Sequence, residues 1–112
     1  MFKEIGQMAS LMKNLPKFRE EIERLQQQIT AEGDAGGGMV KVKVNGKLQM
    51  LSLTISPEAI RPEDREVLED LIVAATNQAL EKARRSLAEE TSKAAANLGL
   101  AIPAGMNLPG LG

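Results

Sequence analysis

The side chains of this chain that could do chemistry are carboxylates, serines, lysines and arginines, because its 112 residues include no Cys and no His. Thiol nucleophiles, imidazole bases and the usual zinc ligand sets are therefore excluded. Paired carboxylates could still transfer protons or hold Mg²⁺, but Ser52, Ser86 and Ser92 have no base to activate them. The composition argues against an enzyme, and we expect no cofactor and no small-molecule substrate.

Two short motifs could be mistaken for ligand sites. The three glycines at 36–38 could cradle a phosphate, but no Lys-Ser or Lys-Thr follows and the next element has a strand pattern. The five acidic residues between 63 and 70 could bind a divalent cation, yet acidic residues also favour the first turns of a helix. We interpret the glycines as a hairpin turn and the acidic residues as a helix N-terminus, and we predict no metal site.

The basic side chains are concentrated in particular segments, although the net charge is only −1. Residues 1–20 hold four basic and two acidic side chains, residues 40–60 hold three basic and one acidic, and residues 71–93 hold four basic and three acidic ones. Residues 61–70 instead hold two basic and five acidic side chains. Clustered Lys and Arg can bind nucleic-acid phosphates, but a solvated helix face has a similar composition, so charge alone leaves the partner open.

A long helix is predicted to carry the first basic cluster. Apolar residues between Met8 and Ile29 recur at alternating spacings of three and four, the repeat of a helix that packs on another helix. The two seams of this repeat are Met8, Leu15, Ile22 and Ile29, and Leu11, Phe18 and Leu25. Pro16 lacks a backbone donor, so we expect it to kink this helix, predicted from Phe2 to about Gln28, or to divide it near Leu15.

Three strands are predicted to follow. Residues 40–44 alternate valine with lysine, as in a half-buried strand. Asn45-Gly46 is typical of a two-residue type I′ turn, which would place Val44 opposite Lys47. This pairing gathers on one face Val40, Val42, Val44, Leu51 and Leu53. A shorter strand near residues 29–34, joined through the glycine turn, completes a three-stranded antiparallel meander.

A second long helix is predicted to carry the basic cluster of residues 71–93. Ser56-Pro57-Glu58 favours one short helical turn, and Pro62 restarts a helix. Apolar residues from Val67 to Ala83 recur at helical spacing, and we expect the helix to run to about Ala96. The chain is thus predicted to be an α+β protein of order α-β-β-β-α, with its two long helices flanking the meander. Residues 1–97 would form the domain, and residues 98–112, rich in Gly and Pro, a flexible tail.

The lengths of these elements predict a homodimer. A seven-residue strand spans about 23 Å, whereas helices of ~25 and ~33 residues span about 38 Å and 50 Å. Both helices therefore extend past a three-stranded sheet, which is itself a small basis for stability. We expect a second copy to cover the remaining apolar seams. The start of the chain lacks a signal-peptide pattern and no run is long and apolar enough for a membrane span, which indicates a soluble intracellular protein.

The segment from Glu32 to Pro57, EGDAGGGMVKVKVNGKLQMLSLTISP, resembles the signature of the YbaB/EbfC family of bacterial nucleoid-associated proteins. So does EVLEDLIVAATNQALEKA, from Glu66 to Ala83. The shared features are a Gly-rich turn followed by Val-Lys-Val at 42–44, Asn-Gly at 45–46, Ile-Ser-Pro at 55–57, Leu-Glu-Asp-Leu at 68–71 and a later Asn77. The resemblance extends over roughly residues 4–90.

This resemblance implies a tweezer-like homodimer of α-β-β-β-α protomers in the nucleoid of the bacterial cytoplasm. Its helical arms would bind double-stranded DNA without metal or cofactor, mainly through phosphates and therefore largely independently of base sequence. In this chain the arm contacts suit six basic residues, namely Lys13, Lys17 and Arg19 on the first helix and Lys82, Arg84 and Arg85 on the second. Lys41 and Lys43 are weaker candidates, because they could face solvent or line the dimer. The family's first helix is usually continuous and richer in Lys, so this chain departs from the family at Pro16 and in lysine content.

Two other functions stay open at this point. A chaperone-like clamp of the prefoldin type also combines two long helices with a hairpin, although the signature above does not fit it. A protein-binding adaptor for replication or recombination factors would use its arms without DNA. Replacing Arg84 and Arg85 by Glu separates these classes, because charge reversal abolishes phosphate binding and leaves an apolar grip intact.

Overall fold

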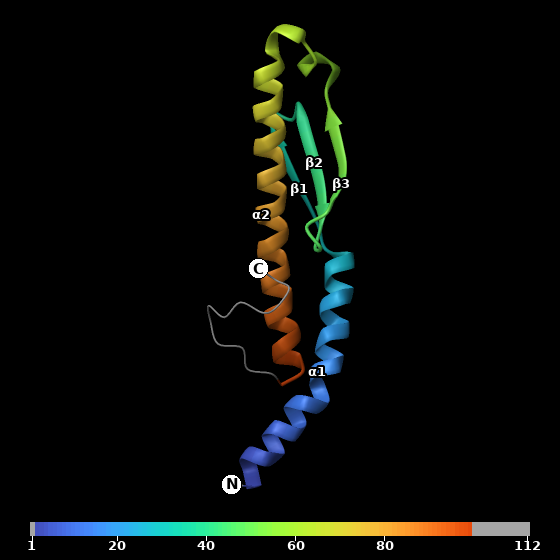
Figure 1. Cartoon of the computed structure of the whole chain (residues 1–112), viewed down its shortest axis with the longest axis vertical. Coiled ribbons are helices and arrows are strands. Elements are labelled where there is room, and N and C mark those ends of the chain that lie inside the picture. The colour runs from blue at the N-terminus through green and yellow to red at the C-terminus, as the bar shows by residue number, and fades with distance from the viewer. Residues whose placement is uncertain (1, 100–112) are drawn as a thin grey trace.

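The computed structural model describes the backbone of residues 2–99 and the side chains of residue 9 and residues 12–99. In chain order the elements are helix α1 (Phe2–Gln28), strands β1 (Thr30–Ala35), β2 (Val40–Asn45) and β3 (Met50–Ile55), two 3₁₀ turns (Pro57–Ala59 and Pro62–Asp64) and helix α2 (Arg65–Asn97). The predicted α-β-β-β-α order and the antiparallel meander β1-β2-β3 are confirmed. The molecule measures 71 × 22 × 17 Å, with the sheet beside one half of α2 and α1 beside the other half (Figure 1). The predicted tail, residues 98–112, lies outside the described residues except for its first two.

Helix α1 is continuous, with Pro16 inside it. The proline therefore does not divide the helix, and Figure 1 shows a bend in its ribbon instead. Pro16 is exposed, so water can reach the carbonyl that loses its hydrogen-bond donor. The apolar seam that follows the proline packs against α2 through Phe18, Ile22, Leu25 and Ile29. Leu15, just before the proline, is exposed, so among the described side chains the packed part of the predicted seam begins at Phe18.

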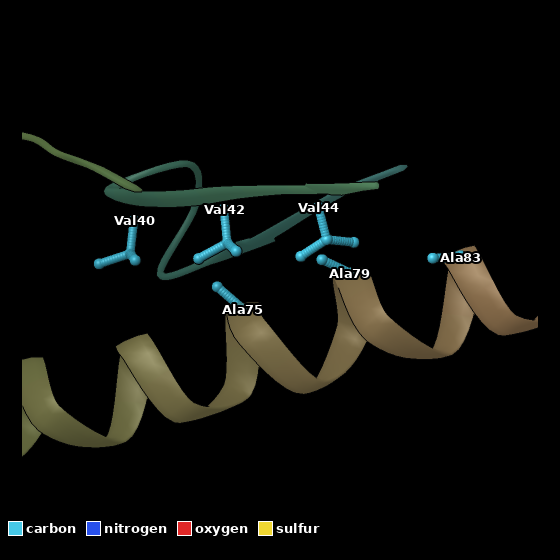
Figure 2. Packing of buried hydrophobic residues seen from close by; sticks show 6 residues of the cluster. All are labelled: Val40, Val42, Val44, Ala75, Ala79 and Ala83. Atoms are coloured by element: carbon cyan, nitrogen blue, oxygen red, sulfur yellow. The ribbon is translucent and has the colours of Figure 1, made fainter. Parts of the chain in front are cut away.

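The core beneath the sheet is built from small residues. The three valines of β2 are buried and face a stripe of α2 formed by Ala75, Ala79 and Ala83 (Figure 2). Gly33 of β1 permits this close packing, because a Cβ there would lie 2.1 Å from the Ala75 carbonyl oxygen. Small side chains on both surfaces thus let the backbone of α2 lie directly against β1 and β2.

The predicted hairpin between β2 and β3 is wrong in turn type and register. Val44 pairs with Met50, and not with Lys47, while positive φ occurs at Leu48 and not at Asn45 or Gly46. The longer connection forms because Asn45 Oδ1 accepts the backbone N–H groups of Lys47 at 2.9 Å and Gln49 at 3.1 Å. Local hydrogen bonds of this kind compete with a tight two-residue turn.

The predicted apolar face of the sheet is covered only in part. The valines of β2 are buried as expected, but Leu51 and Leu53 are 51% and 42% exposed. Met50, which the longer turn places opposite Val44, is 47% exposed. The reason is the position of α2, which packs against β1 and β2 and leaves β3 uncovered (Figure 1).

Helix α2 begins at Arg65, later than predicted, because Pro62 opens a separate 3₁₀ turn. Its buried positions repeat every three or four residues from Ala75 to Ala95, so one stripe meets first the sheet and then α1. Within the described part of the chain, no helix is long and apolar enough to cross a bilayer.

Candidate nucleic-acid interface

The two helices that carry the predicted basic residues pack antiparallel. One apolar cluster joins Phe18 and Leu25 of α1 to Leu87, Ala94 and Ala95 of α2. Asn14 donates from Nδ2 to the Leu98 carbonyl oxygen at 3.1 Å, which places the end of α2 level with Asn14. The earlier residues of α1 therefore extend past the end of α2 as an arm (Figure 1).

All six basic residues predicted to contact DNA are exposed, but they form two separate groups. Lys17 lines the same hollow as Ala94 of α2, so the α1 group lies near the C-terminal end of that helix. Lys82, Arg84 and Arg85 lie about ten residues earlier in α2, which corresponds to about 15 Å along the helix axis. The six side chains are therefore not joined in a single patch.

Within each group the side chains point in different directions. Successive residues of a helix are rotated by about 100°, so Lys13 and Lys17 share one side of α1 and Arg19 lies on the opposite side. In α2, Lys82 and Arg84 lie on the two flanks of the buried Ala83, and Arg85 points away from it. Each group thus presents charge on more than one surface.

Acidic neighbours neutralise some of the basic side chains. Arg85 Nη2 lies 3.5 Å from Glu81 Oε1, and Arg24 forms an ion pair with Glu21. The hydrogen bond from Arg24 lowers the pKa of the Glu21 carboxyl, which stays ionised at neutral pH. In the described part of the chain, no carboxylate lies within ion-pair distance of Lys13, Lys17, Arg19, Lys82 or Arg84. These five side chains are therefore not engaged in ion pairs within the described residues.

The two lysines of β2 lie on the outer face of the sheet, opposite acidic residues. Lys41 pairs in register with Asp34, and Lys43 pairs with Glu32. Opposite charges directly across two strands attract each other. This arrangement weakens the case for these lysines as DNA contacts.

The hollow between α1 and α2 has mixed charge. It has a volume of about 400 Å³, and its lining residues are Lys17, Glu20, Glu21, Arg24, Ala94, Asn97 and Leu98. Because acidic and basic side chains both line it, it favours neither an anion nor a cation. Among the side chains that the structure describes, no three carboxylates gather into a metal-binding group.

Lys47 is not among the DNA contacts predicted from the sequence, although it lies in the basic segment 40–60. This residue is exposed on the connection between β2 and β3, where the wrong hairpin would have made it the first residue of a strand. The residue that could have indicated this longer connection is Asn45, since an Asn side chain often accepts hydrogen bonds from the backbone a few residues further on.

Comparison with known proteins agrees with this fold. Residues 4–98 match the YbaB/EbfC DNA-binding family. A nucleoid-associated protein of Pelotomaculum thermopropionicum is 43% identical over 96 residues, which cover 83% of this chain and 91% of that protein. A nucleoid-associated protein of Caldanaerobacter subterraneus is 40% identical over 105 residues, which cover 91% of this chain and 87% of that protein.

A solved structure has a similar fold. It is the crystal structure of the uncharacterized protein HP0035 from Helicobacter pylori, which aligns with a TM-score of 0.56 and 26% sequence identity. The alignment covers 80% of this chain and 99% of that chain. With the family match over residues 4–98 and relatives of about 40% identity over most of its length, this chain belongs to the YbaB/EbfC DNA-binding family.

Proposed function

We propose that this protein binds double-stranded DNA through the phosphate backbone, largely without regard to base sequence, and associates with the nucleoid in the bacterial cytoplasm. The observation that carries the proposal is a set of five exposed cationic side chains, without ion-pair partners in the described part of the chain, on the helices of a DNA-binding family member. Lys and Arg contacts to phosphates supply affinity without reading the sequence.

The separation of the two basic groups supports contacts at several points along one duplex. About 15 Å along the helix axis corresponds to between four and five base pairs at 3.4 Å per step. The α1 and α2 groups could therefore engage different phosphates of the same DNA molecule, and neither contact requires a helix to enter a groove. Such binding depends on total charge and spacing, which is why we expect little sequence preference.

We also propose a homodimer that forms at β3. At the edge of β1, the Asp34 N–H already has a partner, because it donates to Gln78 Oε1 at 2.7 Å. The β3 edge has no such contact with the described side chains, and its exposed Met50, Leu51 and Leu53 continue the apolar face of the core. An open edge strand with an uncovered apolar face favours pairing with another chain. Two protomers joined in this way would carry two α1 arms, in the manner of tweezers.

The experiment that tests DNA binding is fluorescence anisotropy of a labelled ~30-base-pair duplex, about three helical turns, at several salt concentrations. We expect affinity to fall with salt, with a log–log slope of about −0.9 for each neutralised phosphate. Light scattering on the same samples reports the oligomeric state. A duplex of scrambled sequence is expected to bind equally well.

Absence of binding at low salt, with an intact dimer, would contradict the proposal. That result would favour the two protein-binding functions, which are an adaptor for replication or recombination factors and a chaperone-like clamp. Replacing both Arg84 and Arg85 by Glu distinguishes these from DNA binding, because only phosphate contacts depend on those two charges.

A further inference from the structure

The connection between β2 and β3, residues 45–49, is firmly held and is called here the Asn45 turn. Asn45 Oδ1 accepts two backbone N–H groups, and Asn45 Nδ2 donates to Gln49 Oε1 at 3.1 Å. The Leu48 N–H donates to the Asn45 carbonyl oxygen at 3.0 Å. Leu48 adopts a φ of 62°, which is rare for leucine, and its side chain packs onto the core beneath the sheet. Lys47 lies between these anchors, so its backbone is fixed while its side chain is exposed.

The Asn45 turn is also anchored to α1. The Gly46 N–H donates to the Ile29 carbonyl oxygen at 3.0 Å, and a Cβ on Gly46 would lie only 2.8 Å from Gln26 Cα. Gln26 follows Leu25, which packs in the same apolar cluster as Leu87 of α2. Just before the turn, Val44 lies next to Ala79, and Ala83 is the next alanine of the stripe in the direction in which β2 runs (Figure 2). The turn follows Val44, so it lies beyond Ala79, toward residues 83–87 of α2.

Arg84 lies on the side of α2 that faces this turn. It follows the half-buried Leu80 by four residues and precedes the buried Leu87 by three, so the three residues share one side of the helix. Leu87 packs against α1, the helix on which the Asn45 turn rests. Lys82 lies on the opposite flank and Arg85 points away. Lys47 and Arg84 are thus brought to the same side, and neither has an ion-pair partner within the described residues.

We propose that Lys47 and Arg84 form one cationic site for phosphates of the DNA backbone, so that the Asn45 turn belongs to the DNA-binding surface together with α2. This inference rests on the proposed function and adds a strand connection to the helical arms. Because the backbone of Lys47 is already ordered, phosphate binding costs less conformational entropy there than on a mobile loop. Asn45 acts as the positioning residue of the site, through its hydrogen bonds to Lys47 and Gln49.

The test compares the salt dependence of DNA binding for the unsubstituted protein, Lys47→Gln and Arg84→Gln, by anisotropy with the same duplex. Lys41→Gln is the matched control, because it removes the same charge from β2 at a position opposite Asp34. Each lost phosphate contact reduces the magnitude of the log–log slope by about 0.9. We expect this reduction for Lys47→Gln and for Arg84→Gln, counted once for each protomer bound to the duplex. The slope should not change for Lys41→Gln. Circular dichroism and light scattering verify that every variant keeps its fold and oligomeric state.

The outcomes separate this inference from the proposed function. An unchanged slope for Lys47→Gln, with a reduced slope for Arg84→Gln, would overturn the inference and leave DNA binding in place. Failure of the unsubstituted protein to bind would overturn both. Asn45→Ala then tests positioning, because it should weaken binding several-fold when Lys47 is present and have no effect in the Lys47→Gln background. Equal weakening in both backgrounds would mean that Asn45 does not act through Lys47.

Discussion

The side chain of Thr91 illustrates how single atoms affect the contact between the two helices. This residue is 2% exposed and its Oγ1 has no hydrogen-bond partner among the described residues. It lies on α2 between Leu87 and Ala94, in the stripe that packs against α1. Burying an unpaired hydroxyl costs about 1–3 kcal/mol, so the contact between α1 and α2 is weaker than an entirely apolar one.

We therefore expect Thr91→Val to raise the free energy of unfolding by about 1 kcal/mol or more, because it keeps the shape and removes the unpaired hydroxyl. Urea denaturation at fixed protein concentration measures the change. The matched control is Thr76→Val in the same helix, where Oγ1 donates to the Ile72 carbonyl oxygen at 2.7 Å. In that variant the free energy of unfolding should stay the same or fall by about 0.5–1 kcal/mol. Destabilisation by Thr91→Val would show that its hydroxyl has a partner, such as one from a second copy.

Gly33 is a second position where one atom decides the packing. A Cβ on Gly33 would lie 2.1 Å from the Ala75 carbonyl oxygen and 2.6 Å from the Ala79 nitrogen, and neither backbone atom can move alone. We expect Gly33→Ala to destabilise the protein by about 3 kcal/mol, the upper end for overpacked cores. Gly37→Ala is the control, since a Cβ there meets no atom within 4 Å and only the positive φ is unfavourable. It should cost about 1–2 kcal/mol. If Gly33→Ala and Gly37→Ala lowered the midpoint of thermal unfolding equally, α2 would not pack as closely against β1 as the structure shows.

At the scale of elements, α1 remains helical on both sides of Pro16. Pro16→Ala should therefore add little helix content by circular dichroism, because the flanking turns are already formed. It should still raise the midpoint of thermal unfolding, since a proline inside a helix costs about 3 kcal/mol relative to alanine. A large gain in helix content would instead mean that the proline breaks α1 in solution. Pro57→Ala, at the first position of a 3₁₀ turn, is the control and should give no such gain in stability.

The elements were predictable where one periodicity dominates. The valine alternation of β2 and the helical spacing of the apolar residues of α2 specify their faces within the local sequence. Both faces are confirmed except at Val67, which is 55% exposed. The hairpin register was not predictable in this way, because the Asn45 side chain competes with the Asn-Gly turn for the same backbone groups. The uncovered face of β3 was also missed, since it follows from the close approach of α2 to Gly33, a contact between residues far apart in sequence.

The same reasoning applies to the candidate site. Composition and family resemblance indicated which residues are basic and exposed, and all six are exposed. Their grouping depends on how α1 and α2 are aligned, which Asn14 and the cluster around Phe18 determine. The proposed site of Lys47 and Arg84 depends on the contact of Gly46 with Ile29 and Gln26, which joins residues far apart in sequence.

At the scale of the whole molecule, dimer formation and DNA binding should be coupled through β3. Leu53→Glu places a charge on the uncovered apolar face, so we expect light scattering to report monomers. The log–log salt slope of DNA binding should then fall to about half, because one protomer provides half of the phosphate contacts. Thr54→Glu is the matched control, since it adds the same charge to the next residue on the opposite face of β3. It should leave the dimer intact, so the difference between the two variants reports which face is covered. Dimers that persist in Leu53→Glu and dissociate in Thr54→Glu would place the interface on the outer face of the sheet, where Lys41 and Lys43 lie.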